Sequence, residues 1–345
     1  MSIDTTFSLP AAGSVERWTT SSRIAVWASV AVLVVLALAP GFMSSGFTDR
    51  MTALFIYIIM AAMWNALAGF GGLVSVGQQV FFGLGAYFTV RLADAGIDPF
   101  VSILIACVLV AAVSYPLSFA MLRLRGGEFA IGMWVVSALV HLCVNLDKLI
   151  NGETGTSLIS LNAYMAAERR DLIYWFALAA MAAFLIGLFV LLRSKTGAAI
   201  QAIRDNEDAA AALGVKVTGT KRLLFVLAAA GIGIAGALWL ASAVSFQPKT
   251  YFSVQWTAYM IFMVLVGGIG TFEGAILGAL IFFAIETWFG SWGVWYLIGL
   301  GLVALIFSLF FPKGLWGAIE NRFGLSLMPV GYRLRLEKSS KETLA

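Results

Sequence analysis

A glycine-rich stretch in the first third of the chain carries polar side chains that could contact a small polar molecule. Residues 69–86 read GFGGLVSVGQQVFFGLGA, with six glycines, one serine and two adjacent glutamines. Glycine disfavours a helix by about 1 kcal/mol relative to alanine, and a buried amide must find hydrogen-bond partners. Neighbouring residues point about 100° apart on a helix, so at least one glutamine is expected to face a polar cavity or a partner subunit.

A second polar stretch, RDNEDAAAALG at residues 204–214, combines charged residues with a run of alanines. Alanine, glutamate and arginine are good helix formers, so we predict one helix over 198–213, bracketed by Gly197 and Gly214. It is either an ordinary solvated loop helix or a docking element, in which charges set the register and small side chains fit a groove. Its charged members are Arg204, Asp205, Glu207 and Asp208.

No enzyme signature accompanies these two stretches. The sequence lacks the H-E-x-x-H and G-x-S-x-G motifs, and it lacks a G-x-x-x-x-G-K-S/T loop that would hold ATP. The single histidine, His141, lies in an apolar run and is expected to be a satisfied group inside a helix. We therefore expect no catalytic residue, no metal site and no cofactor in this chain.

The composition indicates a membrane protein. Of the 345 residues, 61% are hydrophobic and only 12% are charged, with a mean hydropathy of +0.94. Soluble domains carry about 25% charged residues, so the expected class is an all-α polytopic membrane protein. The net charge of +4 is attributed to basic cytoplasmic loops and not to nucleic-acid binding.

Ten apolar stretches approach the roughly 20 residues that cross a bilayer. Several are short or interrupted by glycine, so about 8–10 transmembrane helices are expected. A polar segment that is too long for a cleaved signal peptide precedes the first stretch, which is therefore expected to be retained. The stretches are 23–40, 51–69, 76–92, 100–122, 128–146, 172–193, 222–243, 254–270, 274–290 and 294–311.

Basic residues predict the orientation. With ten crossings both termini share one side, and 16 of the 22 Lys and Arg residues fall on that side. The positive-inside rule then predicts N-in and C-in. The expected organisation is a polar cytoplasmic segment 1–22, a transmembrane domain 23–317 that includes an external loop 147–171 and the cytoplasmic helix 198–213, and a cytoplasmic tail 318–345.

Glycine also interrupts a later span. The stretches 65–90 and 265–290 lie in the first and last thirds of the chain, and paired broken segments point to a transport path. In the second, Gly270, Gly274 and Gly278 recur every four residues, a spacing that lets helix backbones approach closely. We expect these three glycines to serve helix packing.

Acidic residues inside a bilayer are costly and often functional. Glu128 and Glu273 fall at predicted cytoplasmic ends or turns, and Glu286 lies toward the outer end of its span. Water can reach all three there, so no acidic residue is expected at mid-bilayer without access to water. That pattern argues against a proton- or ion-coupled carrier.

Several stretches, in this order along the chain, resemble the M-type membrane subunit of branched-chain amino acid importers of the ATP-binding-cassette (ABC) class, the LivM-like permeases. The resemblance covers about residues 50 to 317. The stretches are NALAGFGGLVSVGQQVFFGLGAY (65–87), RLRGGEFAIGMWVV (123–136), NGETGTS (151–157), GAAIQAIRDNEDAAAALGV (197–215), MVLVGGIGTFEGAILGA (263–279) and FFPKGLWG (310–317).

The resemblance implies that the 198–213 helix couples the chain to an ATPase. Importers of this class dock a cytoplasmic E-A-A-x3-G loop into the ATPase, which transmits its motion through that loop. Asp208, Ala209, Ala210 and Gly214 match this pattern, with aspartate in place of glutamate. The later I-x-L-P part of the pattern is replaced by LFVL at 224–227, which leaves the contact details open.

Glu128 is a further departure, because the family often has an aromatic residue there. The preferred interpretation is a cytoplasmic salt-bridge cluster with Arg123 and Arg125. The alternative is an altered substrate preference.

The implied function is the permease subunit of an ATP-driven importer that moves branched-chain or related small amino acids by alternating access in the bacterial inner membrane. Its implied partners are a homologous H-type permease subunit, two cytoplasmic subunits that bind ATP and Mg²⁺, and a periplasmic or extracellular substrate-binding protein. Alternatives are the same machine carrying urea or short-chain amides, a stand-alone secondary carrier or channel, and a membrane scaffold without a path of its own.

The resemblance also makes the first glycine-rich stretch a candidate wall of the substrate path. Packing against the companion subunit explains its two glutamines almost as well. The candidate path residues are Ser75, Gln78, Gln79, Gly83 and Tyr87.

Overall fold

Long apolar helices make up most of the chain. The computed structural model describes residues 13–16, 20–311, 313–323, 327–328, 330 and 333–336. Most of the expected N-terminal segment 1–22 and much of the tail 318–345 therefore lie outside the described residues. The helices of ten or more residues are α1 (Thr20–Leu38), α2 (Ser45–Asn65), α3 (Gln79–Asp94), α4 (Pro99–Met121), α5 (Gly127–Asn145), α6 (Ala166–Arg193), α7 (Lys195–Asp205), α9 (Val217–Ala243), α11 (Val254–Gly267), α12 (Phe272–Phe289), α13 (Val294–Phe310) and α14 (Gly314–Phe323).

Short elements join these helices. A π-helical turn, Ala66–Phe70, continues α2, and 3-10 turns occupy Ala39–Gly41, Gly152–Thr154, Ile159–Ala163 and Gly290–Trp292. Two short helices are α8 (Glu207–Ala212) and α10 (Pro248–Tyr251). Strand β1 (Gly13–Glu16) pairs antiparallel with β4 (Arg333–Leu336), and β2 (Thr156–Ser157) pairs antiparallel with β3 (Ser245–Phe246).

Nine helical segments of the described chain are long and apolar enough to cross a membrane, which confirms the expected 8–10 crossings. The predicted span 76–92 is not among them, because α3 starts only at Gln79 and has 16 residues. At about 1.5 Å per residue, α3 is about 24 Å long, shorter than the roughly 30 Å hydrocarbon core.

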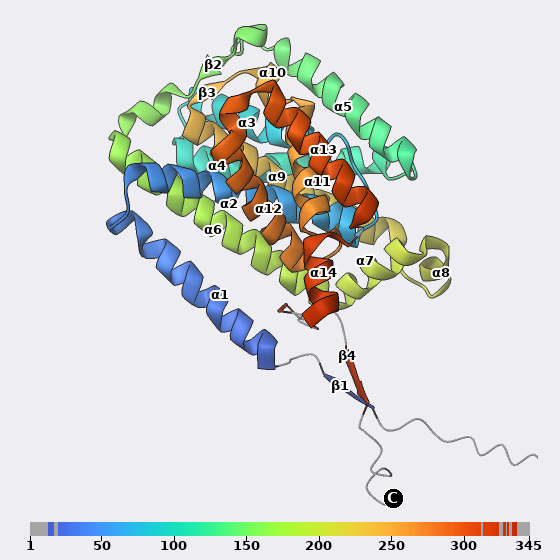
Figure 1. The fold of residues 1–345 in the computed structure, drawn as a ribbon. Helices are drawn as coiled ribbons and strands as arrows, with labels where there is room; N and C mark the ends of the chain where they lie inside the picture. The colour runs from blue at the N-terminus through green and yellow to red at the C-terminus, as the bar shows by residue number, and fades with distance from the viewer. Residues whose placement is uncertain are drawn as a thin grey trace, which may run out of the picture.

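The bundle has two distinct ends (Figure 1). One carries α7, α8 and α14, and we call it the α7–α8 end. The other carries α10 and the β2–β3 pair, and we call it the β2–β3 end. Helix α1 lies along the edge of the bundle. Only 6% of the residues in its most apolar stretch are buried, against 94% in the Ser45–Phe70 segment. Helix α2 is therefore the central helix, and α1 presents its side chains outward.

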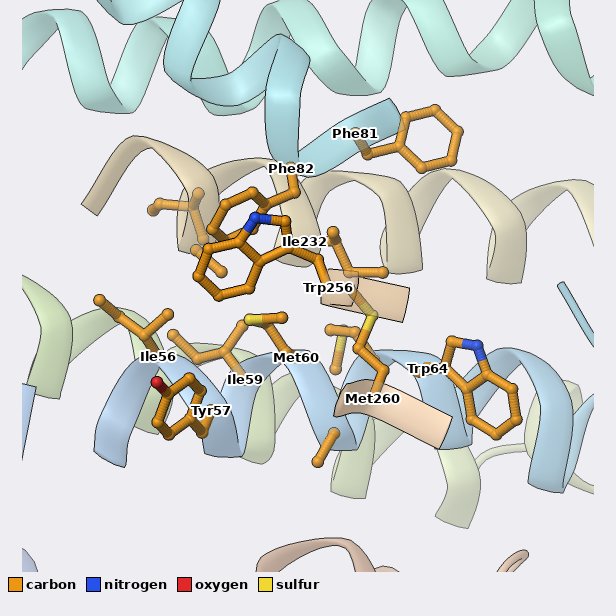
Figure 2. Close-up of a cluster of buried hydrophobic side chains, with 14 of the residues drawn as sticks. Ile56, Tyr57, Ile59, Met60, Trp64, Phe81, Phe82, Ile232, Trp256 and Met260 are labelled. Carbon is orange, nitrogen blue, oxygen red and sulfur yellow. The ribbon is translucent and has the colours of Figure 1, made fainter. Parts of the chain in front are cut away.

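The core gathers around α2 (Figure 2). Side chains of α2 such as Met60 face Trp256 and Met260 of α11, while Phe82 of α3 stacks on Trp256 with ring centroids 4.2 Å apart. Glycine permits another close contact between helices at α3. A Cβ at Gly85 would lie 2.6 Å from the carbonyl carbon of Gly233 in α9, so the α3 and α9 backbones touch directly.

The predicted loop 147–171 is shorter in the structure, because α6 already begins at Ala166. Its first turn, AAERRD, contains good helix formers, and the helix extends past its apolar part. Arg170 in this turn pairs with Asp49 of α2, with Nε 3.2 Å from Oδ1. The charges that suggested a loop are therefore the polar end of a long helix.

Candidate functional site

The first glycine-rich stretch interrupts the bundle, as the sequence predicts. The chain leaves α2 through the π-helical turn and runs without helical structure over residues 71–78 before α3 begins. Gly72 has a φ of +69°, a conformation that L side chains rarely adopt. A Cβ at Gly77 would lie 2.8 Å from the backbone nitrogen of Trp134, so this segment lies directly against the backbone of α5.

Most polar groups of this interruption have partners. The carbonyl of Ser75 accepts a hydrogen bond from Trp64 Nε1 at 3.0 Å, and its hydroxyl accepts one from the Gly77 amide at 3.3 Å. The backbone amide of Gln79 donates to the Thr257 hydroxyl at 3.1 Å, and that hydroxyl donates to Gln79 Oε1. Buried Thr257 of α11 is thus the partner of Gln79, which the sequence alone did not reveal.

Gln78 differs from its neighbour. Its side chain is 0% exposed, and neither Oε1 nor Nε2 hydrogen-bonds to any described residue. An amide buried without partners costs about 1–3 kcal/mol. The Gln78 amide thus differs from the Gln79 amide, which bonds to Thr257.

Gly83 and Tyr87 lie further along α3, toward the β2–β3 end. A Cβ at Gly83 would lie 2.5 Å from the Phe252 ring, and the Tyr87 hydroxyl donates to Asp147 at 2.7 Å. The structure therefore brings Ser75, Gln78 and Gln79 together at the start of α3 and sets the other two candidates apart from them.

The second glycine-broken segment meets the first. Helix α11 ends at Gly267 and α12 starts at Phe272. In the turn between them the amide of Gly270 donates to Asn65 Oδ1 at 2.8 Å, and Asn65 Nδ2 donates to the Thr271 carbonyl at 2.8 Å. A Cβ at Gly69 would lie 2.5 Å from the Gly270 nitrogen. Asn65 thus ties the two interruptions together.

The three glycines that recur every four residues in the second segment do not all lie on a helix. Gly270 lies in the turn between α11 and α12, with a φ of +75°, and is not part of α12. Gly274 and Gly278 lie on α12 where it approaches α11: Cβ atoms there would lie 3.1 Å from the carbonyl carbon and from the Cα of Gly267, respectively.

The predicted single helix over 198–213 is wrong, because two helices occupy this region. Helix α7 ends at Asp205, and Asn206 adopts φ −159° and ψ 108°, which is extended backbone. Its side-chain oxygen accepts a hydrogen bond from the Ala209 amide at 2.9 Å. Asparagine is among the best N-cap residues, so Asn206 ends α7 and starts α8.

The α7–α8 unit is anchored on one face and open on the other. Ile200 and Ile203 of α7 and Ala210 of α8 are buried, and Lys221 of α9 pairs with Glu207 at 2.6 Å. The open face carries exposed Asp208 and Ala209, together with Leu213, which is 85% exposed. Gly214 closes α8 with a φ of +86°, as glycine commonly does after a helix.

Arg204 links this unit to the first interruption. Its Nη1 donates to the carbonyl of Gly69 at 3.2 Å, and its Nη2 pairs with Asp205 Oδ1 at 2.8 Å. The side chain also covers Gly72, where a Cβ would lie 3.3 Å from Arg204 Cγ. The end of α7 therefore touches the junction at which the two broken segments meet.

Acidic side chains hold the loop at the β2–β3 end. Glu153 lies 3.0 Å from His141 Nε2 of α5 and accepts a hydrogen bond from the Lys249 amide at 2.9 Å. Asp147 accepts from Tyr87 and lies 3.2 Å from Arg91 Nε. These contacts fasten the loop to α3, α5 and α10.

The other acidic side chains differ from the expectation. Glu128 is exposed and takes part in none of the ion pairs of the described residues, so the salt-bridge cluster with Arg123 and Arg125 is not formed. Glu286 lies near the end of α12, as expected, but its side chain accepts a hydrogen bond from Tyr57 of α2 at 2.7 Å. The described residues contain no group of three or more His, Cys, Asp or Glu side chains that could hold a metal ion.

Membrane-length apolar helices define a multi-pass helical membrane protein. The profile of a family described as "Branched-chain amino acid transport system / permease component" matches residues 46–311. The chain therefore belongs to this family of ABC-type transport permeases, and it is a multi-pass protein of the bacterial inner membrane.

Curated relatives carry the same family name. The high-affinity branched-chain amino acid transport system permease protein LivM of Escherichia coli is 29% identical over 249 residues, which cover 64% of this chain and 59% of that protein. The match thus spans less than two thirds of that relative. A probable branched-chain amino acid transport permease protein LivM of Methanocaldococcus jannaschii is 24% identical over 257 residues, covering 69% of this chain and 72% of that protein.

Solved structures give weaker likenesses. A chain of a metal-chelate type ABC transporter in an inward-facing conformation is 14% identical, with a TM-score of 0.46 over 77% of this chain and 89% of that chain. A chain of PsaBC from Streptococcus pneumoniae is 15% identical, with a TM-score of 0.36 over 74% of this chain and 95% of that chain.

Proposed function

We propose that this chain is a membrane-spanning subunit of an ATP-driven importer that moves branched-chain or related small amino acids by alternating access. Family membership and the names of the relatives support the substrate class. The observation that carries the mechanism is the hydrogen bond from Arg204 to the Gly69 carbonyl. It connects a surface unit suited to docking with the junction of the two interrupted spans.

In this proposal the α7–α8 end faces the cytoplasm, and both termini lie on that side. The distribution of Lys and Arg supports this orientation. A cytoplasmic ATPase docks on the open face of α8, which carries Asp208, small alanines and the exposed Leu213. An exposed apolar side chain with small neighbours suits insertion into a partner groove.

Motion of the α7–α8 unit then reaches the substrate path through Arg204. The guanidinium holds the end of the π-helical turn, and Asn65 joins that turn to the α11–α12 turn. Glycines at both turns accept backbone changes at little cost. The ATPases can shift the carrier only through different affinities for its two states, so α7 and α8 must sit differently in each.

The path itself runs past the start of α3, where Ser75, Gln78 and Gln79 gather. The unpartnered amide of Gln78 supports this assignment, because a substrate or water in the path would satisfy it. The partners are a homologous permease subunit, two subunits that bind ATP and Mg²⁺, and a substrate-binding protein that delivers cargo at the β2–β3 end. This chain supplies no ATP site of its own.

The test is uptake by the reconstituted complex. The chain is co-expressed with the permease, ATPase and binding-protein genes from its own gene neighbourhood, purified, and placed in liposomes with ATP on the ATPase side. We expect radiolabelled leucine to accumulate only with ATP and all membrane subunits, and labelled urea and acetamide not to accumulate. ATP-independent uptake by the chain alone, or uptake of urea in place of leucine, would contradict the proposal.

A further inference from the structure

Glu286 is an acidic side chain inside a membrane-length segment. It lies in the Phe272–Trp292 span, and none of the ion pairs among the described residues provides it with a cation. Its carboxylate accepts one hydrogen bond, from the Tyr57 hydroxyl at 2.7 Å. A carboxylate can accept about four hydrogen bonds, so most of its capacity is unused. Acidic groups in such places are rare and mark functional sites.

Two further tyrosines lie beside this carboxylate. Tyr259 of α11 and Tyr296 of α13 interact electrostatically with Glu286 and with each other. Tyr296 is 7% exposed, yet its buried hydroxyl has no partner with hydrogen-bond geometry among the described residues. The cluster of Tyr57, Tyr259, Glu286 and Tyr296, which we call the Glu286 cluster, thus contains a carboxylate without a cation and a buried hydroxyl whose hydrogen-bonding capacity is not filled.

Aromatic rings line the cluster. Tyr57 meets Phe282 edge to face at 5.0 Å and lies 5.9 Å from Trp239. Tyr259 lies 4.7 Å from Phe282 and 6.0 Å from Trp256. Aromatic faces attract cations electrostatically, most strongly where water is excluded. The aromatic walls therefore favour a positive charge, as the carboxylate does.

A polar side chain connects the cluster to the surface of this chain. Gln255, in the first turn of α11, is exposed, and its Nε2 donates to the Tyr259 hydroxyl. Ala258 of the same helix is also exposed. Gln255 thus links the Tyr259 hydroxyl to the exposed face of α11, in the half of the bundle nearer the β2–β3 end, the side from which the proposed function brings the substrate.

We propose that the Glu286 cluster binds the primary ammonium group of the amino acid during its passage. An ammonium group has a positive charge and three donors, which match the Glu286 carboxylate and the hydroxyl oxygens of Tyr296 and Tyr259. A neutral amide such as urea would leave the carboxylate without a counter-charge, and a carboxylic acid anion would be repelled by it. This inference rests on the proposed function and adds the feature of the substrate that is recognised.

The test measures binding to the purified membrane complex without the binding protein. Leucine, isopentylammonium, which lacks the carboxylate, and 4-methylpentanoate, which lacks the ammonium, are titrated separately, with potassium chloride as an inorganic-cation control. The variant Glu286→Gln keeps the size and the Tyr57 partner but removes the charge. The matched control is Glu273→Gln at the other end of the same helix.

We expect Glu286→Gln to weaken leucine and isopentylammonium binding about 10- to 100-fold, the range for a lost hydrogen bond to a charged group. Binding of 4-methylpentanoate should not weaken, and Glu273→Gln should match the natural chain. A second variant, Tyr296→Phe, keeps the ring but removes the hydroxyl, and it should weaken isopentylammonium binding.

Unchanged isopentylammonium affinity in both Glu286→Gln and Tyr296→Phe would overturn the inference, as would equal competition by potassium. The two proposals fail separately. If the natural complex imports leucine with a KM that Glu286→Gln does not change, the inference fails and the proposed function stands. If isopentylammonium binding depends on Glu286 but the complex imports no amino acid, the proposed function fails and the ammonium site stands.

Discussion

The guanidinium of Arg204 donates a hydrogen bond to the carbonyl oxygen of Gly69 at 3.2 Å, across 135 positions of the sequence. The first residue lies in the last turn of α7, and the second lies in the π-helical turn that follows the central helix α2. Asn65 extends the contact to Gly270 in the turn between α11 and α12. One side chain at the surface is thus connected, through two hydrogen-bonded steps, to both interrupted spans.

The close contact of the two interruptions predicts a strong effect of added volume. In Gly69→Ala the new Cβ would lie 2.5 Å from the Gly270 nitrogen, and overpacking of this kind costs about 1–3 kcal/mol. We expect a lower melting temperature in detergent and reduced uptake. Gly187→Ala is the control, because nothing lies within 4 Å of a Cβ there. Equal melting temperatures for the two variants would contradict the close contact.

The open face of α8 predicts where the ATPase binds. Asp208→Arg reverses the charge on this face, and Gly214→Arg forces a large side chain into a φ of +86°, which L residues rarely adopt. We expect both variants to reach the membrane but to co-purify with little ATPase. Asp94→Arg makes the same charge reversal at the β2–β3 end and should retain the ATPase. Full retention in Asp208→Arg and Gly214→Arg would remove α8 from the docking surface.

The sequence predicts the apolar helices and the first interruption because their causes are local. Apolar length identifies the spans, and clustered glycines with Gln78 and Gln79 identify the break. The division of α7 from α8 is also local, since Asn206 is a strong N-cap residue, but helix propensities summed over the alanines outweighed it in the prediction.

The remaining features depend on distant contacts. Nothing near Asn65 in the sequence indicates that it binds Gly270, and nothing near Glu286 indicates that Tyr57 turns its carboxylate into the bundle. Both contacts join residues more than 200 positions apart. A single sequence contains no information about which of its distant polar residues meet.

The two adjacent glutamines are expected to respond in opposite ways to the same substitution. Gln78→Met removes a buried amide without partners and should raise the free energy of unfolding by about 1–3 kcal/mol, while uptake falls because the path loses a polar contact. Gln79→Met breaks the hydrogen bond from Thr257 and should lower stability. Melting temperatures and leucine uptake are measured for both. Destabilisation by Gln78→Met would show that its amide has a partner after all.

The turn before α4 gives a pH dependence with a definite sign. The Tyr164 hydroxyl donates to Asp98 at 2.5 Å and holds the pKa of that carboxyl below its ordinary value, with help from the Val101 and Phe100 amides. A lowered folded-state pKa stabilises the fold above the unfolded value of about 3.9, and this contribution is lost as the pH falls through the folded-state pKa.

The variant Tyr164→Phe tests this, because it keeps the ring packed on Phe100 but removes the donor. We expect the natural chain to melt at a higher temperature than the variant at pH 7. The difference should shrink steadily below about pH 4. A difference that stays constant with pH would assign the effect to packing.

The central claim is that Arg204 transmits the work of the ATPase to the substrate path, and the number of leucine molecules imported per ATP hydrolysed by the reconstituted complex tests it most directly. In Arg204→Ala, docking through α8 is intact, so we expect ATP hydrolysis to continue while imported leucine per ATP falls about tenfold, which corresponds to about 1.4 kcal/mol of lost coupling. Arg125→Ala, at an exposed arginine in the turn between α4 and α5, should keep the natural ratio. An unchanged ratio in Arg204→Ala would contradict the account.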